Sequence, residues 1–179
     1  MDALITSMID FVSANRQWAL WIALVFAAAE TTAFISIAIP STAILIGVGA
    51  LVATGGVDFL PIWVGASIGA VIGSTFSWWL GRHYGDRILR MWPLRDHPDL
   101  VTRGTTLFAK WGVWAIVIGH FFGPLRPVVF LMAGISRMRV LHFHFFNVAG
   151  SLAWAWAVPK SGEVGGNVLA YLWQLVTGG

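Results

Sequence analysis

Apolar residues dominate this chain in long runs, and most charged residues are confined to short stretches between them. The segment 17–57 contains a single charged residue, Glu30, and the segment 59–81 contains none. Two further apolar runs cover 111–136 and 140–159. A helix of about 20 apolar residues is long enough to cross the hydrocarbon core of a bilayer. The pattern predicts an all-α polytopic membrane protein, in which 59–81 is the clearest transmembrane helix.

Two of these runs contain internal breaks that predict hairpins. The run 17–57 is long enough for two passes or a hairpin, and the neighbours of Pro40 are apolar, so a bend there stays within the membrane. The run 111–136 is interrupted by Gly-Pro-Leu-Arg-Pro at 123–127, and a proline removes a backbone donor and opposes a continuing helix. We expect 111–136 to be a re-entrant hairpin. A single proline-kinked span is the alternative.

The basic residues predict which side of the membrane each connection faces. The segment 82–110 carries the strongest basic excess, and Arg137 and Arg139 follow the second hairpin. Basic connections favour the cytoplasmic side, which predicts a cytoplasmic basic loop at 82–110. Both basic clusters share that side only if 111–136 enters the membrane and turns back. The short segment 164–179 is predicted as a C-terminal helix that either crosses or lies on the surface.

The order of elements suggests an inverted repeat of a re-entrant helical hairpin plus a transmembrane helix, within a single membrane domain over 1–179. Gly73-Ser74 followed by Trp79 and Gly150-Ser151 followed by Trp156 occur at the same spacing, which is a weak internal echo. Inverted repeats with broken helices are typical of secondary transporters, whose sites lie near the bilayer midplane. The sequence therefore favours transport.

Composition supports a lipid environment and excludes several functions. Hydrophobic residues make up 58% of the 179 residues and charged residues 11%, whereas soluble domains are about a quarter charged. There are no cysteines, which excludes disulfides and cysteine-based metal sites or nucleophiles. The net charge of +3 is more simply an orientation signal than a nucleic-acid-binding surface. We expect no cofactor, no metal and no nucleic-acid partner.

Glu30 is the first candidate functional residue, because it lies within an apolar run. An ionised carboxylate in the membrane costs at least about 2.5–3.5 kcal/mol unless it is paired, hydrated or protonated. Such a group suits a proton carrier or a partner for a cation. A static salt bridge or an interfacial position is the alternative.

Arg126 is the second candidate, at the predicted tip of the second hairpin between Pro124 and Pro127. Its guanidinium stays charged and offers a planar fork of donors suited to phosphate. This favours a phosphorylated or carboxylated substrate, and pairing with Glu30 is the alternative. His120, six residues earlier, adds a donor that can change its charge near physiological pH, although a lone buried histidine is often only structural.

Gly65, Gly69 and Gly73 form a stripe of small residues that permits close helix contact. The stripe also offers a surface for a homodimer, and the sequence leaves the oligomeric state open. The same stretch matches the G-x-S-x-G pattern of serine hydrolases, with His142 or His144 as a distant base. That motif requires a strained turn. Its mid-helix position favours packing, and we expect no enzymatic activity.

Several motifs resemble the DedA family, also described as the VTT or SNARE-associated domain. The family patterns are F-x-R-x-x-P-x-x-R, A-G-x-x-x-M, F-x-x-x-N-x-x-G and a G-x-x-x-G-D stretch, and they match in order over nearly the whole chain. The residues that carry the resemblance are His120, Gly123, Pro124, Arg126, Pro127, Gly134, Met138, Asn147, Gly150 and Trp154, preceded by Glu30, Pro40, Gly69, Gly73 and Gly85.

The resemblance implies a bacterial inner-membrane transporter with two facing re-entrant hairpins. It implies a flippase for undecaprenyl phosphate or a related phosphate-bearing lipid, or for a phospholipid such as phosphatidylethanolamine, with coupling to protons. Glu30 matches the glutamate of the family's first hairpin, and Arg126 matches its second essential arginine. Three positions depart from the pattern: His120 replaces the first arginine, Thr42 replaces an acidic residue, and Ser74 replaces an aspartate.

Four functional hypotheses follow, of which the fourth, a passive assembly module, is disfavoured by the buried charges. The leading one is a proton-coupled flippase in which Glu30 handles a proton while Arg126 and His120, with Thr42 and Ser74 nearby, hold the lipid head group. The second is a proton-coupled transporter of small ions. The third is a membrane enzyme acting on lipid phosphates or peptides, which is disfavoured because no nucleophile lies beside a base in the sequence.

Overall fold

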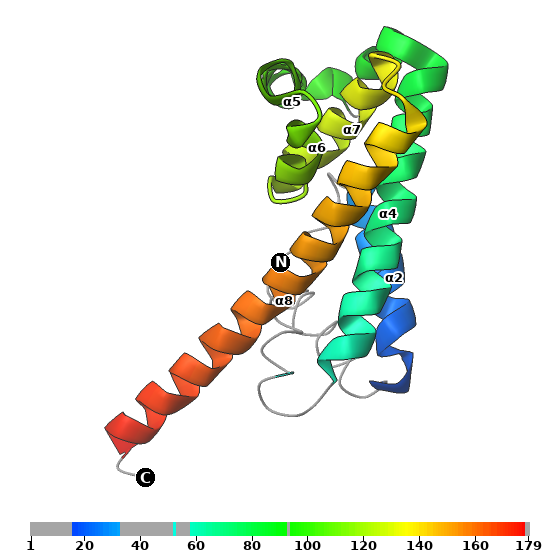
Figure 1. Cartoon of the computed structure of the whole chain (residues 1–179). Coiled ribbons are helices and arrows are strands. Elements are labelled where there is room, and N and C mark those ends of the chain that lie inside the picture. The colour runs from blue at the N-terminus through cyan, green and yellow to red at the C-terminus, as the bar shows by residue number, and fades with distance from the viewer. Residues whose placement is uncertain (1–15, 33–51, 53–57, 93, 178–179) are drawn as a thin grey trace.

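The computed structural model describes residues 16–32, 52, 58–92 and 94–177 (Figure 1). Within these ranges the ordered elements are all helical and none is a strand, which confirms the all-α fold class. Most of the predicted first hairpin, including Pro40 and Thr42, lies outside the described residues. The elements are η1 (Arg16–Trp18), α2 (Ala19–Thr31), α4 (Phe59–Tyr84), η2 (Gly85–Arg90), η3 (Leu94–Asp96), α5 (Pro98–Trp111), α6 (Trp114–Gly119), η4 (Gly123–Leu125), α7 (Arg126–Ile135) and α8 (Val140–Thr177).

Helix α4 is the central element, and its boundaries follow from local sequence. It ends at Tyr84, and the next residue, Gly85, has a φ of 58°, a left-handed conformation that glycine adopts without a steric penalty. The stretch Phe59–Arg90 is the one helical stretch among the described residues that is both long and apolar enough to cross a membrane. This agrees with the prediction of a span at 59–81.

Helix α2 packs parallel to the first half of α4. Gly65 faces the backbone of Leu20, and Gly69 faces that of Leu24, so a side chain at either glycine would collide with α2. Close contact between helices is therefore the role of the glycine stripe within the chain, and a homodimer would need a different surface. Because α2 ends where Thr31 meets Gly73, it ends about midway along α4.

Helices α6 and α7 form a short hairpin beside the other half of α4 (Figure 1). The two helices run antiparallel, because Gly119 contacts Val129 near the turn while Ile116 lies in the same apolar cluster as Ala133. On its other side α7 approaches α4 closely, since a Cβ at Gly134 would collide with the backbone at Trp78. The turn of this hairpin falls in 120–125, at the interruption predicted from the sequence.

Helix α8 runs antiparallel to α4 in its first part, and its C-terminal part extends away from the other helices (Figure 1). Its first part stacks Phe143 on Trp78, and farther along Trp63 donates a hydrogen bond to the carbonyl oxygen of Leu152 at 3.1 Å. The prediction of separate helices at 140–159 and 164–179 is wrong, because α8 continues through Pro159. Pro159 removes one backbone donor, but helices of membrane proteins tolerate such a loss.

The connection at 82–110 also differs from the prediction, because most of this polar loop is helical. Helix α4 extends to Tyr84, and α5 covers the last part of the segment. Leu100, Val101 and Phe108 give α5 an apolar face that packs on the α7 side of the molecule. A polar composition therefore concealed an amphipathic helix.

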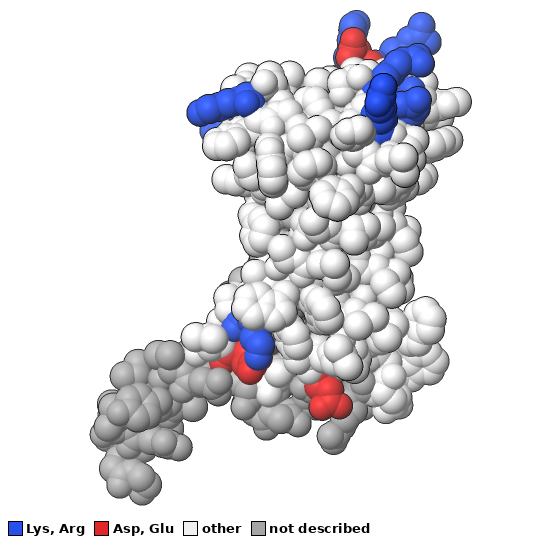
Figure 2. Space-filling model, viewed as in Figure 1, with Lys and Arg blue, Asp and Glu red and all other residues white. Residues whose placement is uncertain are grey.

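The exposed charged side chains of the described residues lie at the two ends of the molecule. Figure 2 shows basic side chains gathered at the α5 end, and a broad middle zone without exposed charge. Many large apolar side chains are exposed on that zone, including Ile68, Ile72, Phe76 and Phe145. A surface of this kind suits contact with lipid.

Candidate functional site

Glu30 and Arg126 form a buried ion pair midway along α4. The distance from Arg126 Nη1 to Glu30 Oε1 is 3.2 Å, and the two side chains are 1% and 5% exposed, respectively. Glu30 lies in the last turn of α2, and Arg126 is the first residue of α7. The structure thus joins the two charged residues that the sequence places in separate predicted hairpins.

The helix dipoles oppose both charges of this pair. A helix C-terminus carries partial negative charge and an N-terminus partial positive charge. Glu30 is at the negative end of α2, and Arg126 is at the positive end of α7. Each charge of the pair is therefore stabilised by the other and not by its own helix. The N-terminus of α7 and the guanidinium of Arg126 together form an electropositive region that favours an anion.

Arg126 is held in place by groups from two further segments. Its Cζ lies 4.3 Å from the ring centroid of Trp154 on α8, and Nη2 donates to the backbone carbonyl of His120. Its Nε has no hydrogen-bond partner among the described residues. The guanidinium is thus positioned while part of its donor capacity stays available.

A polar network surrounds His120 beside the ion pair. The ring is fully buried, and its Nε2 lies 3.0 Å from Asn147 Oδ1 and 3.4 Å from Ser151 Oγ. Ser74 donates to the same Asn147 oxygen at 2.7 Å. With the amide oriented in this way, His120 donates through Nε2. Ser74 therefore reaches the site indirectly, through Asn147.

Buried polar atoms without partners gather in this network. His120 Nδ1 and Asn147 Nδ2 have no hydrogen-bond partner among the described residues, like Arg126 Nε. A buried polar atom left in this state costs about 1–3 kcal/mol, and each such case calls for an explanation. Two of these atoms, on Arg126 and Asn147, are fixed donors, which fits a site that receives an oxygen-rich ligand.

Glycines allow the two hairpin segments to approach α4 and α8. A Cβ at Gly150 would lie 2.5 Å from Cδ2 of His120, so the glycine makes room for the imidazole. Gly73 does the same for Thr31 and Ala28 of α2. No described residue lies within 4 Å of a Cβ built at Gly123, so the described part of the chain gives no packing reason for a glycine there. The two prolines lie in η4 (Pro124) and in the first turn of α7, where Pro127 is buried.

Sequence reasoning missed two residues of this site and misjudged one. Asn147 was expected to be part of a structural motif, yet it links Ser74 to His120. Ser151 and Trp154 were not predicted as site residues. All three occupy one face of α8, four and then three residues apart, and this helical spacing of a polar stripe was the available signal.

The predicted alternatives receive little support from the described residues. Ser67 of the G-x-S-x-G stretch lies inside α4, while His144 packs against Trp78 in the other half of that helix. No cluster of three or more potential metal ligands occurs among the described residues.

Comparison with known proteins identifies the family. The VTT domain model matches residues 39–163. The inner membrane protein YabI of Escherichia coli is 28% identical over 144 residues, which cover 80% of this chain and 57% of YabI. YghB, another inner membrane protein of Escherichia coli, is 32% identical over 125 residues, covering 69% of this chain and 57% of YghB.

A third relative is the uncharacterized membrane protein Rv2637 of Mycobacterium tuberculosis, 33% identical over 127 residues that cover 68% of this chain and 58% of the relative. This chain thus spans less than two thirds of the length of these curated relatives. No solved structure matches it. The chain belongs to the DedA family, defined by the VTT domain, and is a protein of the bacterial inner membrane.

Proposed function

We propose that this protein is a proton-coupled transporter of a phosphate-bearing lipid, with undecaprenyl phosphate or a related lipid phosphate as substrate. The observation that carries the proposal is the buried Glu30–Arg126 pair midway along α4, where α2 and α7 meet. A fixed arginine in the middle of a membrane protein is costly unless it serves a substrate or a structural partner. Here it faces both.

The arrangement of the segments supports transport by alternating access. Helix α2 reaches the pair along one half of α4, and the α6–α7 hairpin reaches it along the other half. We interpret both as the membrane-inserted arms of opposed re-entrant hairpins. Gly73 admits α2 just as Gly150 admits His120, and Ser74 and Ser151 follow these glycines on antiparallel helices. This correspondence supports an inverted repeat with its site at the centre.

Electrostatics then couples the lipid phosphate to a proton. While Glu30 is ionised it occupies the guanidinium, and a phosphate would add a further negative charge to a buried site. Protonation of Glu30 weakens the pair and leaves Arg126 with an unbalanced positive charge. The phosphate replaces the carboxylate as the partner of Arg126. Each head group therefore enters with a proton.

The His120 network completes the head-group site in this proposal. Arg126 supplies charge-assisted donors, and the free Nδ2 of Asn147 supplies a neutral one. Trp154 keeps the guanidinium in place through a cation–π contact. With His120 in place of an arginine, the site holds one fixed positive charge. The monoanion of a phosphomonoester balances this charge once Glu30 is protonated.

Reconstitution tests the proposal. The purified chain in vesicles should move head-group-labelled undecaprenyl phosphate or a labelled phosphomonoester lipid between leaflets, and faster under an imposed proton gradient. Arg126→Ala should reduce transport to the rate of empty vesicles. The double variant Glu30→Gln/Arg126→Gln serves as the matched control for folding, because it removes both buried charges together.

Each outcome of this assay has a consequence. Equal transport by the wild-type chain and the well-folded double variant would exclude the assigned site. Transport of phosphatidylethanolamine at the same rate as the phosphomonoester would replace the substrate class with a phospholipid. Ion uptake that is indifferent to added lipid phosphate would favour a transporter of small ions.

A further inference from the structure

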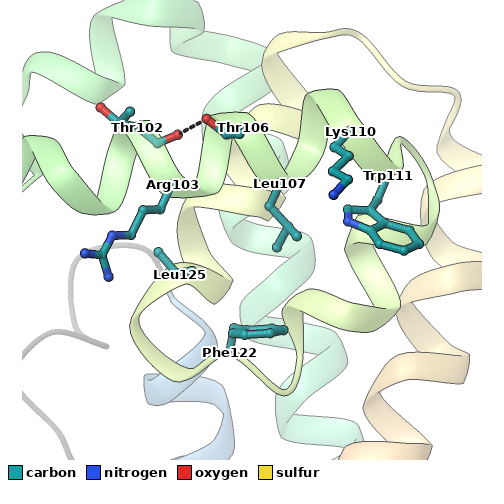
Figure 3. A pocket seen from close by; sticks show the side chains of 8 residues that line it. All are labelled: Thr102, Arg103, Thr106, Leu107, Lys110, Trp111, Phe122 and Leu125. Carbon is teal, nitrogen blue, oxygen red and sulfur yellow. Dashed lines mark hydrogen bonds between the residues drawn. The ribbon is translucent and has the colours of Figure 1, made fainter.

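A second, exposed groove lies away from the buried pair, between α5 and the turn of the α6–α7 hairpin (Figure 3). Its volume is about 370 Å³. Helix α5 supplies one wall and the turn supplies the other, as the close-up shows. The lining residues are Thr102, Arg103, Thr106, Leu107, Lys110, Trp111, Phe122 and Leu125.

Two cations border the groove and none of its lining residues is acidic. Arg103 and Lys110 are seven residues apart, so they lie on the same side of α5, and both are exposed. Neither has a carboxylate partner among the described residues, and Lys110 lies 5.7 Å from the ring centroid of Trp111. The positive charge of this groove is thus not neutralised by the protein that surrounds it in the described ranges.

The neutral polar groups of the groove are already used within α5. Thr106 donates to the carbonyl oxygen of Thr102 at 2.8 Å, and Thr102 donates to that of Pro98 at 2.9 Å. Their hydroxyl protons are therefore not available to a ligand. Recognition in the groove is left to the two cations and to apolar contact.

The remaining lining is apolar. Leu107 and Phe122 face each other across the groove, and Leu125 borders it beside them (Figure 3). Leu125 immediately precedes Arg126. A neighbouring face of α5 is fixed, because Gly104 packs on Val128 of α7. A charged rim above an apolar floor is complementary to an amphiphile with an anionic head.

We propose that this groove binds one lipid of the surrounding leaflet through an anionic phosphate head group. The phosphate lies between Arg103 and Lys110, and the first part of a hydrocarbon chain lies on Leu107 and Phe122. Trp111 is the last residue of α5. Tryptophan and basic side chains are enriched where a membrane protein meets the lipid phosphates, so this end of α5 places the bound head group at that depth. The proposal goes beyond the transport function, because binding here requires neither Glu30 nor Arg126.

Photo-crosslinking tests this groove directly. The full chain is placed in phosphatidylcholine nanodiscs with a small fraction of a phosphatidic-acid probe that carries a diazirine in its acyl chain. Labelled peptides are then located by mass spectrometry. The wild-type protein should be labelled on α5 and on the α6–α7 turn. Arg103→Gln/Lys110→Gln should reduce this labelling on the order of tenfold, the loss expected from two charge-assisted contacts.

Two further variants separate the groove from the general surface charge. Arg87→Gln/Arg90→Gln removes the same charge from exposed residues of η2, outside the groove, and should leave labelling within about twofold. Leu107→Trp fills the groove without changing charge and should reduce labelling severalfold. Monodisperse elution of each variant establishes that it has folded.

The opposite outcomes overturn the proposal. An equal loss of labelling in the two double variants would mean that the general positive surface potential, and not the groove, attracts the lipid. Equal labelling by a diacylglycerol probe without phosphate would remove the head-group contact, and displacement by millimolar inorganic phosphate with no need for a lipid chain would assign a free-anion site instead. Because the assay measures binding, a chain that is labelled but transports nothing retains the groove and loses the proposed function.

Discussion

Two cationic places in this protein differ in what surrounds the charge. Arg126 is almost fully buried and is balanced by Glu30, Trp154 and a backbone carbonyl. Arg103 and Lys110, at the α5 groove, are exposed and have no acidic partner among the described residues. A buried charge without its partner is costly, whereas an exposed one is well solvated. The buried site can therefore couple the binding of a phosphate to that of a proton, whereas the exposed groove can only bind an anion.

The largest effect should come from breaking the buried pair on one side. Arg126→Ala leaves Glu30 without its guanidinium in a site closed to solvent, and we expect a loss of about 3–5 kcal/mol in the free energy of unfolding. Denaturant titration in detergent micelles measures it. The double variant Glu30→Gln/Arg126→Gln should recover most of the loss. If the double variant is as unstable as the single one, the pair does not carry the stability of this region.

The next effect concerns the space for His120. Gly150→Ala places a methyl group against the buried imidazole, and we expect a destabilisation of about 1–3 kcal/mol together with disturbed transport. Gly123→Ala is the matched control, since no described residue lies near a Cβ there, and it should stay within about 0.5 kcal/mol. Equal stability of the two variants would show that the imidazole can move without cost.

The hydrogen bonds of Asn147 should have a similar or smaller effect. Asn147→Leu removes the acceptor of His120 Nε2, whereas the Ser74 hydroxyl keeps the carbonyl oxygen of Ala70 as an acceptor. One buried donor is left without its partner, and we expect a cost of about 1–3 kcal/mol. Adding Ser74→Ala should cost less in this background than in the wild-type chain. Strict additivity of the two substitutions would argue against a shared network.

The contact between Trp154 and Arg126 should have a smaller effect. Trp154→Phe preserves an aromatic face but weakens the cation–π interaction, and we expect a loss of about 0.5–2 kcal/mol. The same substitution at the exposed Trp156 is the control and should have almost no effect. An equal response at both positions would mean that Trp154 acts only through apolar packing.

The smallest effect on stability belongs to the groove. Arg103→Gln/Lys110→Gln should change the free energy of unfolding by less than about 0.5 kcal/mol, because both side chains are exposed. The same double variant should clearly weaken lipid labelling. A large loss of stability would show that these two cations stabilise the fold, as Arg126 does, and would contradict the proposed difference between the two sites.

The sequence predicts the charged pair better than it predicts its surroundings. Glu30 and Arg126 are recognisable because a charge in an apolar run requires a reason, and the prolines around Arg126 mark a break in the helix. The helix α5 was missed because its polar composition concealed an apolar face. Ser151 and Trp154 were missed because the face of α8 that meets the site is decided by tertiary packing. The absence of charged residues around Ser151 and Trp154 in the sequence does not indicate which face of α8 is directed towards the site.

The most direct test of a shared proton and phosphate site is the proton count on lipid binding. Titration calorimetry of the detergent-solubilised chain with a short-chain lipid phosphomonoester, repeated in buffers of different ionisation enthalpy, gives the number of protons taken up. We expect the wild-type chain to take up about one proton more per lipid than Glu30→Gln does. Equal proton uptake by the wild-type chain and Glu30→Gln would contradict coupling through the Glu30–Arg126 pair.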